Sequence, residues 1–267
     1  MRRLAVAATC VALLLQAPGV AAHANAGDLV QAAGFDQHLS HPVPPALAFR
    51  DDDGRDVRLG DYLGTVPVVL AFAYYGCSNL CPTVIGNLAH VLESTGLRPG
   101  AQYRVVVVSI DSRDSPPVAA RRKVDYLQDA ASGASGRAWH LLTGSGSSID
   151  ALTRAAGFRY AYDEATHQYA HPVGVLLLTP DGRIARYLLG FNFTPTELRG
   201  AIDDASGDRI AAPAQRLLLL CFHFDHAGKY SAAIIETLRW VAITMLAAAL
   251  LLFAVRRRRA ETMRQAR

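Results

Sequence analysis

The feature that most constrains the fold of this chain is an apolar run that ends close to two cysteines. Residues 66–75 are apolar or aromatic and predict a buried strand. Cys77 and Cys81 follow, and Pro82 suits an early helical position. If Cys81 lies in the first turn of a helix, the spacing of four puts both thiols on one face, with Cβ atoms about 5–6 Å apart. The sequence therefore predicts a strand-to-helix turn that carries two thiols.

Strand-like and helix-like segments alternate around this turn. Strand patterns cover residues 66–75, 103–110, 139–142, 173–178 and 184–189, and helical patterns cover residues 83–94, 117–128, 149–156 and 194–202. Pro180-Asp181-Gly182 predicts a hairpin turn between the last two strands. This order predicts an α/β domain with a mixed central sheet, which the thioredoxin-like fold satisfies. In such sheets the site forms at the carboxyl ends of the strands, where Cys77 falls.

Two local patterns predict further detail. Residues 46–59 alternate apolar and polar side chains around Asp51-Asp52-Asp53-Gly54, which predicts a hairpin. The acidic run has two interpretations, a metal site and a solvated turn, and we favour the solvated turn. Near the end of the domain, Thr194 with Glu197 three residues later predicts a helix cap.

Both ends of the chain carry targeting signals. Arg2 and Arg3, an apolar run over residues 4–15 and small residues up to Ala26 are typical of a secretory signal peptide, with cleavage near Ala26. Residues 234–255 hold about one membrane crossing of apolar sequence, and four arginines follow it. Positive charge beside a span marks the cytoplasmic side. We therefore expect a periplasmic domain held on a bacterial inner membrane by one C-terminal transmembrane helix.

The predicted organisation has six parts: a signal peptide (1–26), a linker or extended arm (27–45), the α/β domain (46–210), a juxtamembrane Cys/His segment (211–233), the transmembrane helix (234–255) and a basic cytoplasmic tail (256–267). The formal net charge is +4, but the signal peptide supplies +2 of it and the tail +5, so residues 27–255 carry −3. No basic excess remains in the domain for nucleic acid.

Cysteine usage points to chemistry at the turn. Removal of the signal peptide removes Cys10 and leaves Cys77, Cys81 and Cys221, an odd number that is unsuited to a purely structural disulfide framework. The close pair can form a disulfide, act as a redox couple or bind a soft metal. Thioredoxin-like redox enzymes usually separate their cysteines by two residues, whereas this chain has three. Two thiolates underfill a tetrahedral zinc site, whereas two thiolates with one imidazole suit copper.

A histidine is the missing member of such a copper site. His90 falls on the helix two turns beyond the cysteines and is expected at the surface, and His140 on a short strand is expected to pack. His171 comes just before the strand at 173–178, and we expect it on a loop beside the cysteine turn.

Three motifs occur together in this chain. They are Cys77-Ser78-Asn79-Leu80-Cys81-Pro82, then Val107-Val108-Ser109-Ile110-Asp111 with Arg113-Asp114-Ser115-Pro116, and His171 followed by an apolar strand and Pro180-Asp181-Gly182. Over about residues 47–202 they resemble the Sco/SenC family of membrane-anchored, thioredoxin-like copper proteins. The chain departs from the family at Thr83-Val84, where acidic residues are frequent, and in its C-terminal rather than N-terminal anchor.

The resemblance implies that Cys77, Cys81 and His171 bind copper. It also implies a metallochaperone, not a turnover enzyme, that helps load the binuclear copper centre of cytochrome c oxidase. Its partners would be the copper-bearing oxidase subunit or another copper chaperone. The alternative is a thiol–disulfide reductase that keeps a partner's copper-ligand cysteines reduced, with Cys77 and Cys81 as a disulfide-forming pair. A peroxiredoxin-like peroxidase fits less well, because it needs one activated cysteine in a different motif.

Two further groups of residues have open interpretations. Asp111 and Asp114 resemble the family's acidic loop near copper, where they would orient a ligand or dock a partner. Either could instead cap the helix that begins near residue 117, and we favour the cap for Asp114. Cys221, His223 and His226 precede the predicted span. They could form a second metal site, supply a resolving thiol to the first pair, or belong to a membrane-interface segment with aromatic anchors.

Overall fold

The chain forms two compact units, Met1–Cys221 and Phe222–Arg267, in a computed structural model. The structure describes residues 31–77, 80–128, 136–164, 167–214, 220–221, 238–247 and 253–254. The predicted signal peptide and basic tail lie outside these residues. The central sheet and the thiol pair belong to the first unit.

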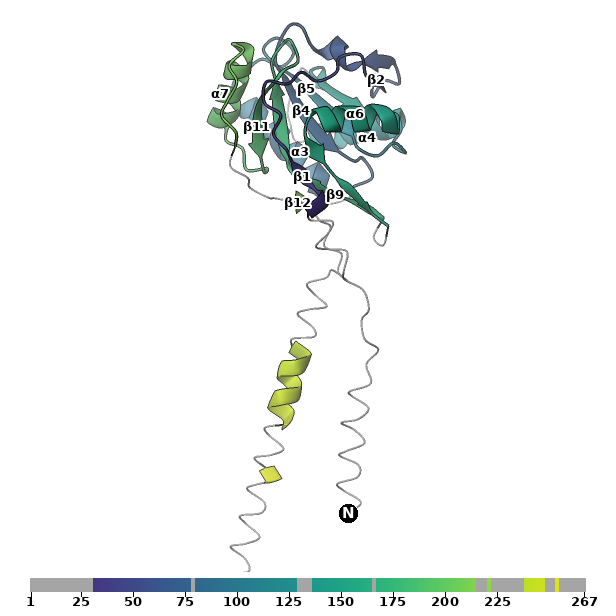
Figure 1. Cartoon of the computed structure of the whole chain (residues 1–267), viewed down its shortest axis with the longest axis vertical. Helices are drawn as coiled ribbons and strands as arrows, with labels where there is room; N and C mark the ends of the chain where they lie inside the picture. The colour runs from purple at the N-terminus through teal and green to yellow at the C-terminus, as the bar shows by residue number, and fades with distance from the viewer. Residues whose placement is uncertain are drawn as a thin grey trace, which may run out of the picture. The chain divides into compact units, whose positions relative to one another are not determined.

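A five-stranded mixed sheet forms the centre of this unit, in the order β11-β10-β4-β5-β6. β4 (Val68–Ala73) runs parallel to β5 (Arg104–Ser109), which runs parallel to β6 (Trp139–Leu142). On the other side of β4, β10 (Gly174–Leu178) and β11 (Ile184–Leu189) form an antiparallel hairpin. The mixed central sheet that the sequence predicts is therefore confirmed, and its central strand is the one that leads to the cysteines (Figure 1).

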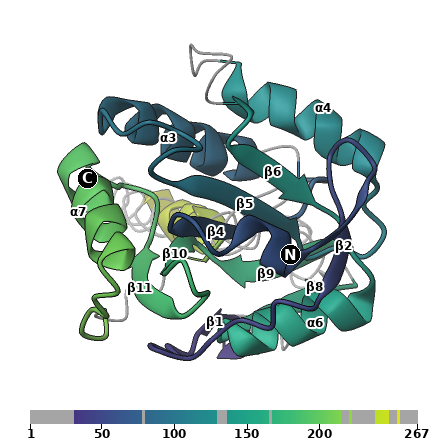
Figure 2. The same ribbon diagram turned by 90° about the horizontal axis from the view of Figure 1, so that it is seen from above.

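Helices cover both faces of the sheet. α3 (Leu80–Ser94) and α4 (Pro116–Leu127) lie side by side along one face, and α6 (Gly146–Ala155) lies on the opposite side (Figure 2). α3 also contacts α7 (Pro195–Ser206). Because α3 and α4 pack against each other, residues on α4 reach the turn from which α3 begins.

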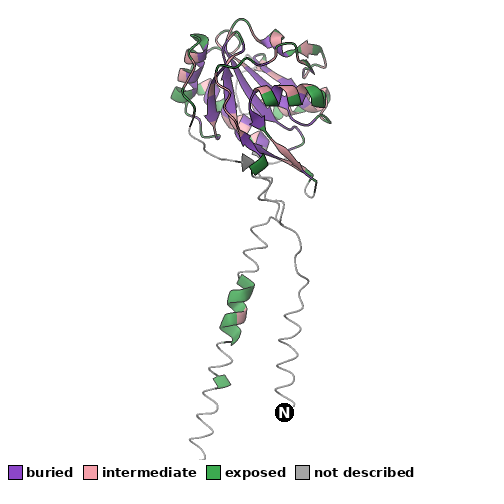
Figure 3. Ribbon diagram, in the orientation of Figure 1, coloured by how far each residue is buried: buried purple, intermediate pink, exposed green. Residues whose placement is uncertain are grey.

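The core explains why these segments are strands. Every residue of β4 is buried, and so are five of the six residues of β5. Figure 3 shows the strands of the central sheet as the most continuous buried part of the unit. Strands covered on both faces read as unbroken Val, Ile and Leu runs and not as alternating patterns. The apolar runs were therefore reliable strand signals.

The N-terminal hairpin forms as predicted, but its acidic turn is not solvated. β2 (Ala48–Arg50) pairs antiparallel with β3 (Asp56–Arg58). Asp51 is only 7% exposed and accepts two backbone N–H groups of its own turn. Asp52 pairs with Lys123 of α4 at 2.7 Å and accepts the backbone N–H of a β6 residue. The expectation of a solvated turn was wrong at these two positions because the turn folds onto α4 and β6.

An extended arm precedes the hairpin, within the segment predicted as a linker or arm. β1 (Gly34–Phe35) pairs antiparallel with β7 (Phe158–Arg159). The Phe35 ring packs edge-on against Phe158 and Tyr187, with ring centroids 5.4 and 5.6 Å apart. From residue 31 onward, this arm is thus bound to the domain.

A second, three-stranded sheet has the order β12-β9-β8. It consists of β8 (Ala161–Asp163), β9 (Gln168–Pro172) and β12 (Leu220–Cys221), all antiparallel. His171 therefore lies in a strand, and the expectation of a loop was wrong. Short polar-aromatic strands such as β8 and β9 carry no long apolar run, so the sequence pattern did not reveal them.

The predicted transmembrane segment, 234–255, is described only in part. Residues 238–247 and 253–254 are helical. Within the described portion of the chain, no helix reaches the length and hydrophobicity of a membrane span. The span over 234–255 stays a prediction.

Candidate metal centre

The cysteine turn joins the carboxyl end of β4 to the start of α3. Cys81 is the second residue of α3 and lies in the first helical turn, whereas Cys77 precedes the helix. Cys77 and Cys81 are 7% and 3% exposed, and both are thiols in this structure. Residues 78 and 79, between them, lie outside the described residues.

Tyr75 anchors this turn through its backbone and its side chain. Its backbone N–H donates to Asp114 Oδ2 at 2.8 Å, and its carbonyl accepts from Arg122 Nε at 2.6 Å. Its buried hydroxyl lies 2.9 and 3.1 Å from the carbonyls of Val107 and Leu142, to which it can donate. The turn is therefore tied to β5, to β6 and to α4, which fixes the chain two residues before Cys77.

Asp114 has a different role from the helix cap that the sequence suggests. The N-cap of α4 is Ser115, and no side chain caps it. Asp114 Oδ2 accepts from Ser109 Oγ at 2.6 Å as well as from the N–H of Tyr75. Burial raises the pKa of Asp114, and these two hydrogen bonds act in the opposite direction. The cap expectation was wrong because Asp114 turns toward the end of β5 instead of toward α4.

Asp111 belongs to the same loop and pairs with Arg113. Its carboxylate accepts from Arg113 Nε at 2.8 Å and from Arg113 Nη2 at 2.8 Å. Burial acts to raise the pKa of Asp111, but the hydrogen bonds from Arg113 and one with Tyr169 outweigh it, so the pKa lies below its ordinary value. This loop is thus charged and hydrogen-bonded, and it reaches β9 through Tyr169.

His171 presents a basic nitrogen with no partner among the described residues. The imidazole is 3% exposed, and its Nδ1 lies 3.0 Å from the carbonyl oxygen of Pro172. A carbonyl only accepts, so Nδ1 carries the proton and Nε2 carries the lone pair of the neutral ring. Nε2 is buried and has no hydrogen-bond partner in the described part of the chain. Burial lowers the pKa of His171, while its contact with Pro172 and the nearby Cys77 act to raise it.

A small pocket connects this imidazole with the cysteine helix. Cys81 and His171 both line it, together with the apolar side chains of Val84 and Ile85. Its volume is about 20 Å³, which is room for about one water-sized occupant. The donors at this pocket are therefore one sulfur and one imidazole nitrogen, surrounded by apolar walls.

Aromatic rings surround His171 on the side of the cysteine turn. Tyr74 lies 6.1 Å from the imidazole and 5.3 Å from the ring of Tyr169, and Phe158 lies 6.1 Å from the imidazole. These rings reduce the access of water. Tyr74 itself is buried, so it belongs to the core as well as to this group of rings.

Two supporting residues were missed by sequence reasoning. Arg122 holds the carbonyl of Tyr75, and Tyr126 is buried with a hydroxyl that has no hydrogen-bond partner in the described part of the chain. Burial raises the pKa of Tyr126 strongly, and Cys81 and Cys77 act in the same direction. Both residues lie on α4, and no local pattern marks which residues of an amphipathic helix approach a distant turn.

The structure brings the predicted donors to one region without closing them around an ion. In the residues that the structure describes, no group of three His, Cys, Asp or Glu side chains could hold a metal. Cys221 is described as part of β12, where it is paired with His171. His223 and His226 lie outside the described residues.

Two other histidines of the domain lie as the sequence predicts. His90 is exposed, and His140 packs against Tyr62 with ring centroids 4.6 Å apart.

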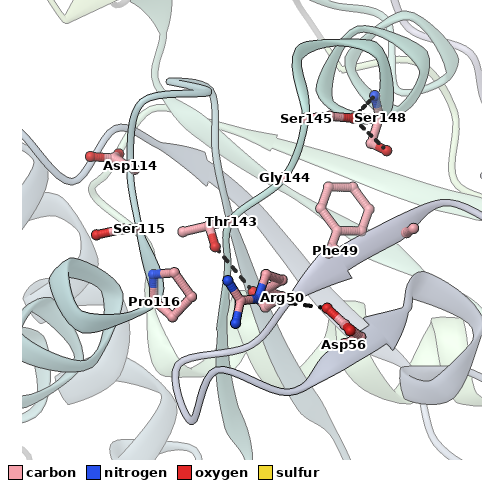
Figure 4. A pocket seen from close by; sticks show the side chains of 11 residues that line it. Phe49, Arg50, Asp56, Asp114, Ser115, Pro116, Thr143, Gly144, Ser145 and Ser148 are labelled. Atoms are coloured by element: carbon pink, nitrogen blue, oxygen red, sulfur yellow. Dashed lines mark hydrogen bonds and ion pairs between the residues drawn. The ribbon is translucent and has the colours of Figure 1, made fainter.

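A larger pocket has a volume of about 380 Å³ (Figure 4). The hairpin β2–β3, the loop before α4 and the start of α6 form its walls. Arg50 and Asp56 face each other across 3.6 Å in this pocket, and Ser145 caps α6. No cysteine or histidine is among its described lining residues, so it is not a candidate for metal binding.

Comparison with known proteins identifies the family. The model of the SCO1/SenC family matches residues 37–205. A candidate electron transfer protein from Aquifex aeolicus VF5 is 25% identical, covering 63% of this chain and 95% of its own, with a TM-score of 0.56. Arabidopsis thaliana ScoI, solved with copper bound, is 20% identical. The match covers 62% of this chain and 99% of ScoI, with a TM-score of 0.50. BsSco, a member of the Sco family of cytochrome c oxidase assembly proteins in which a disulfide switch was identified, is 22% identical. The match covers 65% of this chain and 97% of BsSco, with a TM-score of 0.51.

A search of curated proteins found no match. These solved structures share the overall fold at TM-scores of 0.50–0.56, so the predicted thioredoxin-like α/β fold of the domain is confirmed. The family model spans well over half of the chain and includes both cysteines of the turn and His171. The chain therefore belongs to the SCO1/SenC family.

Proposed function

We propose that this protein binds copper through Cys77, Cys81 and His171 and delivers it during assembly of the binuclear copper centre of cytochrome c oxidase. Copper is the cargo in this proposal, and the acceptor is the copper-bearing oxidase subunit or another copper chaperone. Membership of the SCO1/SenC family supports the proposal. So does the copper bound in the Arabidopsis thaliana ScoI structure, which shares the fold.

The observation that carries the proposal is the state of His171. Its Nδ1–H is held by the carbonyl of Pro172, so the ring presents Nε2 as a neutral nitrogen donor. That nitrogen is buried and has no hydrogen-bond partner among the described residues. A buried polar atom without a partner costs free energy, about 1–3 kcal/mol, which a ligand at this position would recover.

The donor set fits copper in its soft, reduced state. Thiolates and imidazole are the ligands that copper(I) accepts, and low coordination numbers suit it. Copper bound here would supply a centre that exchanges thiolate ligands with an incoming partner. The residues of the chain would hold it between the cysteine turn and β9, while Tyr74 and Tyr169 limit the access of water. Since the three donors do not enclose an ion completely, a partner's thiols can approach.

We place the domain on the periplasmic side of a bacterial inner membrane, with residues 234–255 as the anchor. Support comes from the apolar sequence of this segment and the arginines after it. The large apolar side chains of the described helical part are exposed, as a surface made for lipid would be, namely Leu238, Trp240, Val241, Met245 and Leu246.

The decisive test is His171→Ala, measured as copper(I) bound per chain and as the rate at which the thiols reduce a disulfide substrate. A metal carrier should lose stoichiometric binding, whereas its dithiol chemistry should stay largely intact. His140→Ala is the matched control, because it also removes an imidazole from a strand but lies away from the thiols. Unchanged copper affinity in His171→Ala would remove the main support for copper delivery and favour the thiol–disulfide reductase.

A further inference from the structure

Two histidines of the N-terminal arm, His38 and His41, lie close together at the ends of a tight turn. The backbone N–H of His41 donates to the carbonyl of His38 at 3.1 Å, which closes a four-residue β-turn. The two imidazole rings have centroids 5.8 Å apart and an angle of 55° between their planes. These two residues, called the histidine pair below, belong to neither the cysteine turn nor β9.

The turn is held on the central sheet by backbone hydrogen bonds. The N–H of Ser40 donates to the carbonyl of Ile184 at 2.8 Å, and the N–H of Ile184 donates to the carbonyl of His41 at 3.0 Å. The N–H of His38 donates to the hydroxyl of Tyr187 at 2.9 Å. Because Ile184 and Tyr187 both belong to β11, the histidine pair has a fixed backbone although it lies in the arm.

Ser40 gives the turn a strained conformation. Its φ is 67°, in the left-handed region that glycine or asparagine usually occupies at the third position of such a turn. A residue with a side chain pays a cost there, on the order of 1–3 kcal/mol, and keeps the conformation only where the surrounding structure imposes it. This conformation closes the turn, and it thereby keeps His38 and His41 close together.

Both rings of the histidine pair present the same nitrogen. His38 Nδ1 lies 3.1 Å from the carbonyl oxygen of Ala155, and His41 Nδ1 lies 3.2 Å from the carbonyl oxygen of Leu39. A carbonyl only accepts, so in the neutral rings Nδ1 carries the proton and Nε2 carries the lone pair. A carbonyl bound to Nδ1 is also the usual arrangement of a histidine that binds a metal through Nε2.

His38 has a second interpretation, as a helix cap. Ala155 is the last residue of α6, and the final carbonyls of a helix have no partner within it. The contact with Ala155 alone would therefore make His38 a C-terminal cap of α6. It does not account for His41, which is exposed and whose Nδ1 contacts a carbonyl of its own turn. Two adjacent Nε2 donors need a different explanation.

We propose that the histidine pair binds copper(II) through both Nε2 atoms. Two imidazoles that share an ion at about 2.0–2.1 Å have centroids at most roughly 6.4 Å apart, and the observed 5.8 Å lies within that limit. Rotation of the side chains, without a change in the backbone, is enough to direct both nitrogens at one ion.

The donor set determines which ion fits. The pair has no thiolate, so it does not favour copper(I), and among divalent first-row ions copper(II) binds such nitrogen donors most tightly. No third Cys, His, Asp or Glu side chain is grouped with the pair in the described part of the chain, so water completes the coordination. The inference does not rest on the proposed function, because the two sites share no donor.

The test removes every other candidate donor first. The background chain is the full-length protein with Cys77→Ser, Cys81→Ser, His171→Ala, Cys221→Ser, His223→Ala and His226→Ala. Copper(II) is added in competition with glycine, and pulsed EPR counts the imidazoles on the bound ion. We expect two imidazoles in the background chain, and one when either His38→Ala or His41→Ala is added. The affinity should fall at least about tenfold in each, since even residues that only support a metal ligand are worth about 10–100-fold.

His90→Ala in the same background is the matched control. It removes an exposed imidazole from α3 and should change neither the count nor the affinity. His41→Ala alters an exposed side chain and leaves the contact of His38 with α6 intact, so its urea unfolding should match that of the background chain.

Two results would overturn the inference. One is equal copper(II) affinity in the background chain, in His38→Ala and in His41→Ala. The other is a loss in only one of the two variants, because a single histidine then binds copper(II) as an isolated surface ligand. Neither result affects the copper(I) proposal, whose donors are absent from every chain in this test.

Discussion

The two sides of the cysteine turn differ in how their polar groups are partnered. On the side of β5 and α4, Asp114, Ser109 and Arg122 form hydrogen bonds that hold Tyr75, although the Tyr126 hydroxyl on α4 has no partner among the described residues. On the side of β9, the imidazole of His171 keeps a buried nitrogen without a partner among the described residues. Both sides are buried and lie close to the thiols in the fold, so burial alone does not explain the difference.

This difference distinguishes a supporting region from a binding region. Buried polar groups in proteins are nearly always hydrogen-bonded, so each exception calls for an explanation. The partnered side fixes the backbone of the turn and thereby the position of Cys77. The unpartnered side offers a donor atom to something that arrives later. The comparison predicts that changes on the first side mainly lower stability, whereas changes on the second side mainly lower binding.

The largest stability effect is expected at Asp114. Asp114→Ala removes the acceptor of the Tyr75 N–H and of the Ser109 hydroxyl, and should lower the free energy of unfolding by about 2–4 kcal/mol, because two buried donors lose their partner. Urea unfolding of the metal-free protein measures this. Asp114→Asn keeps one acceptor oxygen and should lose less. If both variants unfold like the unmodified protein, the partnered side is not the support that we infer.

The next effect is a pH dependence due to His140, which lies away from the thiols. Burial, assisted by Lys123, lowers the pKa of His140 to about 4, against 6.5 for the free side chain. The unfolded chain therefore binds more protons between these values, so the stabilising contribution is complete above pH 6.5 and is lost as the pH falls toward 4. The loss should be on the order of 1–3 kcal/mol.

His140→Gln isolates this contribution. Urea unfolding at several pH values between about 4 and 7 should show a shallower loss of stability for the variant than for the unmodified chain. The lowered pKa of His171 also reduces stability as the pH falls, and the raised pKa of Asp114 increases it. Both effects are present in the variant and in the unmodified chain, so the difference between the two pH profiles reports on His140 alone. Identical slopes would contradict the burial assigned to this imidazole.

Two tyrosines give a smaller and sharper comparison. The Tyr75 hydroxyl lies within hydrogen-bond distance of two carbonyls, and Tyr75→Phe should lower the free energy of unfolding by about 1–2 kcal/mol. The Tyr126 hydroxyl is equally buried but has no partner among the described residues. Tyr126→Phe should therefore change the free energy of unfolding by less than about 0.5 kcal/mol, or increase it slightly. Thermal unfolding of the two variants side by side measures the contrast. Equal losses in both would show that the Tyr126 hydroxyl is bonded in solution.

The central sheet could be predicted from sequence because its strands are buried on both faces. Segments such as 139–142 and 184–189 match β6 and β11 residue for residue. The short strands β1, β8, β9 and β12 could not be predicted in this way, since each depends on a partner strand and not on a long apolar run. The position of His171 in β9 was misjudged for this reason.

Within the candidate site, the sequence named the donors but not their supports. Cys77, Cys81 and His171 were chosen by residue type and spacing. Arg122 and Tyr126 resemble other residues of an amphipathic helix, and only the packing of α4 against α3 gives them their place near the turn. Asp114 was assigned to the nearest helix because sequence patterns weigh local partners first. Its actual partners are Tyr75, two residues after β4, and Ser109 at the end of β5.

Residue types and local patterns are sufficient for the α/β class, for the position of the thiol pair after a buried strand, and for the family resemblance. These follow from side-chain chemistry and from the periodicity of adjacent residues, which are local properties. Only the pairing of strands decides which nitrogen of His171 carries the proton and that its other nitrogen is left without a partner among the described residues. The same is true of the backbone pairing of Cys221 with His171. Those facts depend on backbone groups whose places are set only when the strands pair.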